Sequence, residues 1–265
     1  MAIIGTIIGD IIGSQYEFNK PLDFDANSAA LFSDKCKFTD DTVLSLATKS
    51  AILNNESFGE SYQSFGRKYA DRGFGGFFYQ WLWDDDLEPY NSFGNGSAMR
   101  VSYIADYYDK LEDVLKYSEQ TAICTHNHPE GIKGAKVVAK CIWMAKNKKK
   151  KEEILQYGID EYPASQYIYS PEYSIKDIMG RYKWNDTCQG SVPVAIRCVY
   201  EANSYIEFIR NVFKLNCDTD TICAIGGGIA EELFGGTGLD DDKILKKYLS
   251  DELYLLMKKI TRKEI

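Results

Sequence analysis

Two short acidic blocks, one near each end of the chain, constrain this sequence more than any other feature. They read Thr39-Asp40-Asp41-Thr42 and Asp218-Thr219-Asp220-Thr221, and each precedes a run with helical character. Both sets of carboxylates are therefore expected at helix N-termini. If the two blocks meet in space, their like charges are costly without cations. The fold then has to bring two distant helix ends together.

A single block of this kind has an ordinary structural explanation. An Asp-Asp-Thr sequence at the start of a helix is usually an N-cap whose acids complement the helix dipole. Two nearly matching blocks favour a metal site, because carboxylate and hydroxyl oxygens are the ligands that Mg²⁺, Mn²⁺ and Ca²⁺ prefer. Neither block has the His or Cys spacing of a zinc site. We expect at least one divalent cation there, with two as the favoured number.

Three consecutive glycines, Gly226 to Gly228, follow the second block within its predicted helix. Each glycine costs of order ~1 kcal/mol of helix stability relative to alanine. The glycines therefore predict a helix face that is pressed against another backbone. A close crossing at this face would bring the two acidic helix ends together.

The hydrophobic periodicity predicts a mainly helical chain. Apolar residues recur at three- and four-residue intervals in 113–125, 134–146, 193–202, 205–215 and 240–260. The last range opens with three aspartates and closes with two lysines, as the helix dipole favours. Short β-branched runs that would build a sheet are few. The predicted fold class is all-α, a compact orthogonal helical bundle with a binuclear metal cleft.

Composition agrees with one domain spanning residues 1–265. The chain has 45% hydrophobic residues and no stretch that resembles a linker, so it can bury a full core. The net charge of −8 argues against a nucleic-acid groove as the main feature. No stretch reaches the ~20 apolar residues that cross a bilayer. Seven cysteines without paired spacing indicate free thiols, and hence a cytoplasmic location.

Six motifs, in a fixed order along the chain, carry a resemblance to a known family. They are Gly9–Glu17, Thr39–Thr42, Tyr90–Arg100, Thr125–Gly131, Gln189–Pro193 and Asp218–Thr221. Together they resemble the ADP-ribosylglycohydrolases, which include the dinitrogenase reductase-activating glycohydrolases and the ADP-ribosyl-acceptor hydrolases. One departure is visible, because the family usually has glycines before the second acidic block and this chain has Asn216 and Cys217.

The resemblance implies a metal-dependent hydrolase that cleaves the N- or O-glycosidic bond between ADP-ribose and a modified acceptor and releases ADP-ribose. It implies two divalent cations, Mg²⁺ or Mn²⁺, as cofactors. The expected partner is an ADP-ribosylated substrate, with a protein side chain favoured over a nucleic acid or a small molecule. The enzyme is expected to act as a monomer.

The metal ligands that the resemblance implies come from both acidic blocks. Thr39, Asp40 and Asp41 are expected to bind one ion, Asp218 and Thr221 the other, and Asp220 to bridge the two. Asp41 and Asp220 are for this reason also counted as catalytic. Cys217 adjoins a ligand, but a thiolate suits a hard cation poorly, so we expect it to be a packing residue.

Glu17 is the third residue assigned to catalysis. On its own such a glutamate is usually a surface or capping acid. In the eukaryotic acceptor hydrolases that this chain resembles, a glutamate at the matching place lies beside the distal ribose and the metals and gates the site. We expect Glu17 to orient or deprotonate the attacking water, or to control access to the metals. Asp10 is the alternative acid, and a structural role suits it better.

The predicted substrate-binding residues come from two of the motifs. The backbone N–H groups of the glycine loop before Ala98 could face a phosphate, although such a loop is ordinarily only a helix cap. The resemblance favours phosphate or ribose binding, and for His126 the alternative is a buried structural hydrogen bond. The glycine-rich stretch 73–76 could border the cleft. The substrate-binding residues are predicted to be Asn95, Gly96, Ser97, Met99 and His126.

Two other classes of function stay open. One is a catalytically silent module that binds ADP-ribose, although all six predicted ligands are present. The other is a hydrolase of a different nucleotide-ribose bond, such as that of an ADP-ribosylated nucleobase or metabolite. The motifs do not identify the acceptor, whether arginine, serine, a nucleobase or a small molecule.

Overall fold

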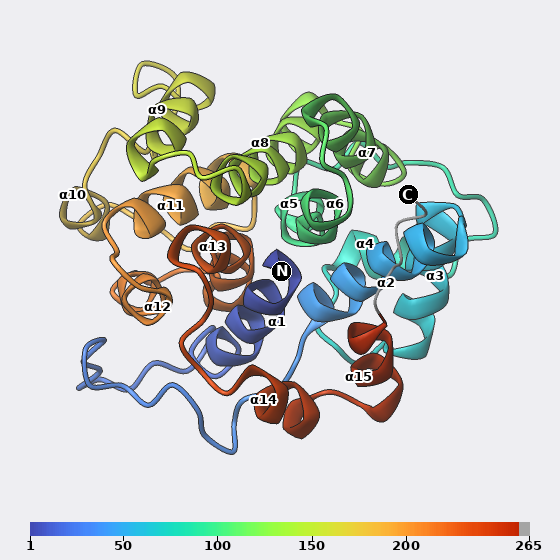
Figure 1. Ribbon diagram of the computed structural model, residues 1–265, viewed down its shortest axis with the longest axis horizontal. Helices are drawn as coiled ribbons and strands as arrows, with labels where there is room; N and C mark the ends of the chain where they lie inside the picture. The colour runs from blue at the N-terminus through green and yellow to red at the C-terminus, as the bar shows by residue number, and fades with distance from the viewer. Residues whose placement is uncertain (260–265) are drawn as a thin grey trace.

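The computed structural model describes residues 1–259, and within this range the chain is helical with no strand (Figure 1). The helices are α1 (Ala2–Gly13), α2 (Asp40–Asn54), α3 (Phe58–Lys68), α4 (Gly76–Trp81), α5 (Gly96–Met99), α6 (Ser102–Tyr107), α7 (Leu111–Ile123), α8 (Pro129–Lys146), α9 (Lys151–Glu161), α10 (Ile175–Met179), α11 (Cys188–Tyr200), α12 (Tyr205–Phe213), α13 (Thr219–Phe234), α14 (Asp241–Tyr248) and α15 (Asp251–Lys258). The prediction of an all-α fold is confirmed.

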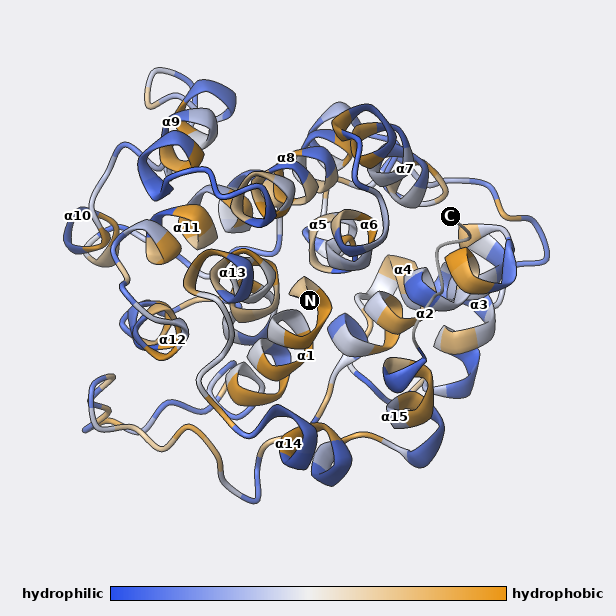
Figure 2. Cartoon of the chain, in the orientation of Figure 1, coloured by the Kyte–Doolittle hydropathy of each residue, from blue (hydrophilic) through white to orange (hydrophobic). Residues whose placement is uncertain are grey.

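Helix α1 lies near the middle of the molecule, and α13 packs along it (Figure 1). Most isoleucines of α1, such as Ile3, Ile7 and Ile11, are completely buried, and Ile4 is partly buried. A helix that is apolar on all sides has to be covered on all sides. Helices α2, α6, α13 and α14 all contact α1. Blue, hydrophilic residues lie mainly on peripheral helices such as α9 and α14 (Figure 2).

The glycines of α13 press against α1, as their sequence predicted. A Cβ atom at Gly227 would clash with the carbonyl group of Gly5, and one at Gly5 would clash with the carbonyl group of Gly227. The two backbones therefore touch, which only glycine permits. The partner of α13 at this crossing is α1, whereas α2 reaches the site from the other side of α1. Helix α1 thus packs against both helices, and their acidic ends also meet directly, because the Thr221 hydroxyl donates to the Asp41 carboxylate.

The predicted continuous helix 240–260 is wrong, because the structure divides it into α14 and α15. Leu249 is extended, with φ −81° and ψ 155°. Ser250 then caps α15, where its side chain accepts a hydrogen bond from the backbone N–H of Leu253. Ser250 with two following acids is an N-terminal signal that the apolar periodicity obscured. Ile260 lies outside the described residues.

The other four predicted helices exist with shifted ends, as α7, α8, α11 and α12. The largest shifts are equal and lie at the starts of α8, which begins at Pro129 rather than Gly134, and of α11, which begins at Cys188 rather than Pro193. The new start of α8 has a clear cause. Proline suits the first turn of a helix, and the His128 side chain caps it by accepting from Glu130 N. No described helix combines the length and apolar character needed to span a membrane.

Candidate active site

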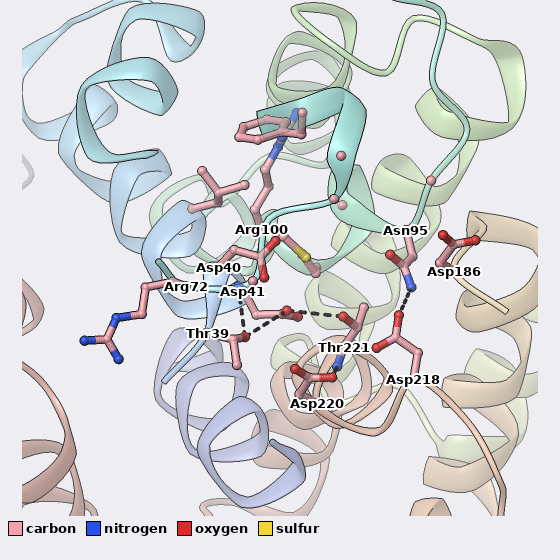
Figure 3. A pocket seen from close by; sticks show the side chains of 18 of the residues that line it. Thr39, Asp40, Asp41, Arg72, Asn95, Arg100, Asp186, Asp218, Asp220 and Thr221 are labelled. Atoms are coloured by element: carbon pink, nitrogen blue, oxygen red, sulfur yellow. Dashed lines mark hydrogen bonds between the residues drawn. The ribbon is translucent and has the colours of Figure 1, made fainter. Parts of the chain in front are cut away.

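A cavity of about 360 Å³ lies where the N-terminal ends of α2 and α13 meet the chain that leaves α1. All but one of the residues predicted for the site line this cavity. Those on its wall are Glu17, Thr39, Asp40, Asp41, Asn95, Gly96, Met99, His126, Asp218, Asp220 and Thr221. Residues separated by two hundred positions in the sequence therefore share one wall (Figure 3).

Asp10 of α1 holds the first acidic block in place. Its carboxylate accepts hydrogen bonds from the backbone N–H of Thr39 at 2.9 Å and from the Thr39 hydroxyl at 2.7 Å. It also accepts from the backbone N–H of Thr42 at 3.2 Å and from the Thr42 hydroxyl. Burial raises the pKa of Asp10 to about 6, against these bonds, which lower it. Asp10 therefore positions the start of α2 from behind.

Asp41 links the two blocks. Its Oδ2 atom accepts from the Thr221 hydroxyl at 3.2 Å and lies 3.3 Å from the hydroxyl oxygen of Thr39 (Figure 3). Its Oδ1 atom is buried and has no hydrogen-bond partner in residues 1–259. A buried carboxylate oxygen without a partner is costly, and a bound cation would satisfy it.

The second block is held by Asn95. The Asn95 side-chain amide donates to Asp218 Oδ2 at 2.8 Å and to the Ser191 hydroxyl at 3.0 Å. Asp218 stands at the N-cap of α13, yet its side chain makes no capping bond. Asn95 lies on the cavity wall, but its amide donates both hydrogen bonds to protein groups, the Asp218 carboxylate and the Ser191 hydroxyl (Figure 3).

The carboxylates form two overlapping clusters whose oxygens lie within 4.8 Å of one another. One contains Asp10, Asp41 and Asp220, and the other contains Glu17, Asp218 and Asp220. Burial first, and then repulsion between the acids, raises the pKa of Asp41 and of Asp220 well above the usual value. Divalent cations would relieve this repulsion. A donor set of carboxylates and hydroxyls fits Mg²⁺, Mn²⁺ or Ca²⁺.

Asp40 belongs to neither cluster, although it is on the wall. Its carboxylate faces the glycine-rich stretch, because a Cβ atom at Gly73 would lie 3.6 Å from its Oδ1 atom. Burial and then Asp10 raise the pKa of Asp40 well above the usual value. Gly73, Gly75 and Gly76 line the cavity here, in agreement with the prediction that this stretch borders the cleft.

Glu17 lies at the edge of the second cluster. The end of α1 is held against α13, because a Cβ atom at Gly13 would come within 2.5 Å of the Asp220 Cα atom. The Tyr16 ring is anchored against Phe213 with their centroids 4.9 Å apart. Burial, and next the charge of Asp218, raises the pKa of Glu17 to about 7. Cations bound at this cluster would lower that pKa again.

Ser97 is the predicted site residue that is absent from the cavity wall. It is completely buried, and its hydroxyl donates to the carbonyl oxygen of Gly131 at 2.7 Å. The sulfur of Cys217 lies 3.8 Å from the carbonyl oxygen of Val212 and 3.8 Å from the hydroxyl of Thr219, so its contacts are with these groups. The structure thus gives both side chains partners within the protein.

Sequence reasoning missed several residues that line the cavity. They are Phe18, Lys37, Leu44, Arg72, Phe77, Phe78, Tyr90, Ser92, Gly94, Arg100, Trp184 and Asp186. Arg100, Ser92, Tyr90 and Gly94 belong to a motif that the sequence did single out. Trp184 and Asp186 precede α11 and have no local signal. Figure 3 shows the side chain of Arg72 pointing away from the acidic clusters.

The sequence of this chain is similar to a known family and to several of its relatives. The sequence matches the family model for ADP-ribosylglycohydrolase over residues 1–263. The ADP-ribosylhydrolase ARH3 of Xenopus tropicalis is 23% identical, over 88% of this chain and 86% of that protein. The human ADP-ribosylhydrolase ARH3 is 24% identical, over 88% and 84%. The ADP-ribosylarginine hydrolase Tri1 of Pseudomonas putida is 21% identical, over 98% and 76%.

A solved structure described as an ADP-ribosylglycohydrolase-related protein complex has the same fold. Its TM-score is 0.73 at 19% identity, and the match covers 96% of this chain and 93% of the other. The family model spans nearly the whole chain, and the acidic blocks that carried the resemblance meet at one cavity. This chain therefore belongs to the ADP-ribosylglycohydrolase family.

Proposed function

We propose that this protein hydrolyses the N- or O-glycosidic bond between ADP-ribose and a modified acceptor, with two divalent cations, Mg²⁺ or Mn²⁺, as cofactors. One observation carries the metal requirement. Asp41 Oδ1 is a buried, unpartnered acceptor in a wall where burial and mutual repulsion raise the pKa of the acids. Membership of the family supports the reaction class.

The proposed ligands divide between the two blocks. Thr39, Asp40 and Asp41 hold one cation, and Asp218 and Thr221 hold the other. Asp220 bridges the pair, which its membership of both carboxylate clusters supports. The Thr39 hydroxyl gives its proton to Asp10 at 2.7 Å and accepts from the backbone N–H of Asp41 at 3.4 Å, so one lone pair stays available to a cation.

When bound, the cations would lower the pKa of a water molecule and orient ribose hydroxyls. Glu17 is proposed to hold or accept a proton of that water, because its carboxylate lies in one cluster with Asp218 and Asp220, beside the place where these acids would hold a cation. The carboxylates around the anomeric carbon would stabilise the positive charge that develops in an oxocarbenium-like transition state. The products are ADP-ribose and the released acceptor.

ADP-ribose is proposed to lie along the wall formed by Asn95, Gly96, Met99 and His126. Ser97 contributes there through its hydrogen bond to Gly131, which fixes the start of α5. A protein side chain is the proposed acceptor, since one relative is named an ADP-ribosylarginine hydrolase.

The test is release of free ADP-ribose from a panel of substrates. Metal-stripped protein is mixed with Mg²⁺ or Mn²⁺ and with peptides ADP-ribosylated on arginine or serine, or with ADP-ribosylated nucleic acid. We expect release from at least one peptide, and none after exhaustive chelation. Full turnover under chelation would overturn the metal requirement. Tight binding of ADP-ribose with no release from any substrate would favour a silent binding module.

A further inference from the structure

Arg100 is a buried cation in the cavity wall. It is 0% exposed, and the carbon of its guanidinium group lies 4.1 Å from the centre of the Tyr62 ring. Its Nη2 atom donates to the carbonyl oxygen of Thr121 at 2.7 Å and to the hydroxyl of Thr125 at 2.8 Å. A guanidinium group can only donate hydrogen bonds. The Thr125 hydroxyl therefore acts as the acceptor toward Arg100.

The same hydroxyl contacts the neighbouring imidazole. Thr125 Oγ1 lies 2.7 Å from His126 Nδ1. A hydroxyl has one proton to donate, and the other acceptor within reach is the sulfur of Cys124, which accepts far more weakly than an imidazole nitrogen. The proton therefore points to Nδ1. An Nδ1 atom that accepts a hydrogen bond cannot carry the ring proton, which leaves it on Nε2.

The imidazole is also uncharged. Burial first, and then the charge of Arg100, lowers the pKa of His126 well below its usual value. A second ring proton would place an imidazolium next to a buried guanidinium. The ring therefore has one N–H group, at Nε2.

The Nε2 atom faces the cavity. His126 lines the cavity wall, and no group in residues 1–259 forms a hydrogen bond with Nε2. A Cβ atom at Gly96 would lie 3.1 Å from Nε2, and one at Gly94 would lie 3.5 Å from it. The absence of side chains at these two positions leaves the N–H group uncovered.

We propose that Arg100 and Thr125 fix His126 as its Nε2–H tautomer, and that this uncharged N–H group donates a hydrogen bond to an oxygen atom of ADP-ribose. The inference rests on the proposed function for the identity of the ligand. Arg100 and Thr125 are positioning residues, because they act through His126. An uncharged donor binds a substrate oxygen without repelling the cations proposed for the same cavity.

The tautomer is tested on the free protein by long-range proton–nitrogen NMR with ¹⁵N-labelled histidine. The chain has only two histidines, and His128→Asn removes the second signal while keeping a good N-cap for α8. We expect a protonated Nε2 and an unprotonated Nδ1 that do not change across neutral pH. A protonated Nδ1, or an imidazolium at neutral pH, would overturn the proposal.

The role in recognition is tested with Thr125→Val and Thr125→Ser, using calorimetric titration with ADP-ribose. Valine keeps the shape and removes the hydroxyl, so Nδ1 loses its donor and the tautomer is no longer fixed. We expect Thr125→Val to bind ADP-ribose about 10-fold more weakly, the scale of one hydrogen bond to a charged group, and Thr125→Ser to match the parent. Parent-like affinity and spectra in Thr125→Val would overturn the relay.

Different results would contradict the proposed function and the relay from Arg100 and Thr125 to His126. If the parent shows the Nε2–H tautomer but does not bind ADP-ribose, the proposed function and the recognition step are both wrong, and the tautomer relay stands alone. If the parent binds and hydrolyses its substrate with the opposite tautomer, the proposed function stands and the relay is wrong.

Discussion

The two acidic blocks are nearly alike in sequence, yet the protein holds them in different ways. Thr39 caps α2, since its side chain accepts from the backbone N–H of Asp41 at 3.4 Å, and it also donates to Asp10. Asp218 occupies the same place on α13 without a side-chain capping bond. Asp218 is instead oriented by Asn95, which stands at the N-cap of α5.

Because of this difference, we expect changes in the two blocks to alter different properties of the protein, folding stability in one case and cation binding in the other. The first block carries the start of α2 and its connection to α1, so a change there affects folding as well as cation binding. In the second block the N-cap residue Asp218 makes no side-chain capping bond, and only Asp220 accepts from a first-turn N–H, that of Thr221 at 3.0 Å, so a change at Asp218 is expected to affect mainly the proposed cation binding. Buried carboxylates that repel one another also destabilise the folded chain when no cation is present.

The largest effect is expected for Asp220→Asn, in the second block. Asp220 belongs to both carboxylate clusters, so its loss weakens both proposed cation positions. Loss of a residue that merely supports a ligand costs 10–100-fold, so release of ADP-ribose should fall by about 10²-fold or more. With chelator present, the melting temperature should equal or exceed that of the parent, because one buried acid with a raised pKa is removed.

The matched control for this prediction is Asp160→Asn, an exposed acid on α9. It should leave turnover and the cation-induced rise in melting temperature as they are in the parent. Parent-like turnover in Asp220→Asn would contradict the proposed bridging role. A large loss of stability in the same variant under chelation would contradict the expected difference between the two blocks.

The second largest effect is expected for Glu17→Gln. Glu17 follows α1 in the chain and lies in one carboxylate cluster with Asp218 and Asp220 of the second block. The amide is nearly isosteric but cannot take a proton, so turnover should fall by ~10²-fold, the scale of a lost acid–base group. Affinity for ADP-ribose should change far less. Single-turnover release and calorimetric binding measure the two quantities. Near-normal turnover would assign Glu17 to structure and leave Asp41 or a metal-bound hydroxide as the base. Loss of both binding and turnover would make Glu17 a substrate anchor.

The sequence predicted the composition of the site better than its internal connections. The acidic blocks could be assigned because ligand type and helix position are local features, and Asp218 and Asp220 both line the cavity. The hydrogen bond from Asn95 to Asp218 joins residues 123 positions apart, so no local sequence pattern predicts it. The clamp of Asp10 on Thr39 and Thr42 likewise depends on how α1 meets α2.

Packing details set the other limit on prediction. The glycines of α13 indicated a close contact, but the sequence did not say that the partner is α1 rather than α2. Ser97 looked available for substrate because glycines precede it, and only the position of Gly131 shows where its hydroxyl goes. The break at Ser250 was readable from its capping signal, and the strong periodicity on either side hid it.

The third prediction compares the two N-caps directly, with Thr39→Ala and Asp218→Asn. In chelator, Thr39→Ala should lower the free energy of unfolding by about 1 kcal/mol, because α2 loses its cap. Asp218→Asn should leave it unchanged or raise it, since α13 loses no capping bond and one buried acid disappears. Denaturant unfolding measures both values. Thr39→Ser is the control that keeps the hydroxyl, and equal losses in the two main variants would contradict the contrast.

The smallest effect is expected for Cys217→Ala, next to the second block. The thiol is buried and bonded to the carbonyl oxygen of Val212, so its removal should cost about 1 kcal/mol or less of unfolding free energy. Cation affinity and turnover should match the parent, because sulfur is a poor ligand for a hard cation and this one contacts the Val212 carbonyl oxygen and the Thr219 hydroxyl. Titration with Mn²⁺ and with Cd²⁺, a softer ion, checks this. A loss of Cd²⁺ affinity in the variant would show that the thiol reaches the cations, and the second block would then contain a ligand that the first block lacks.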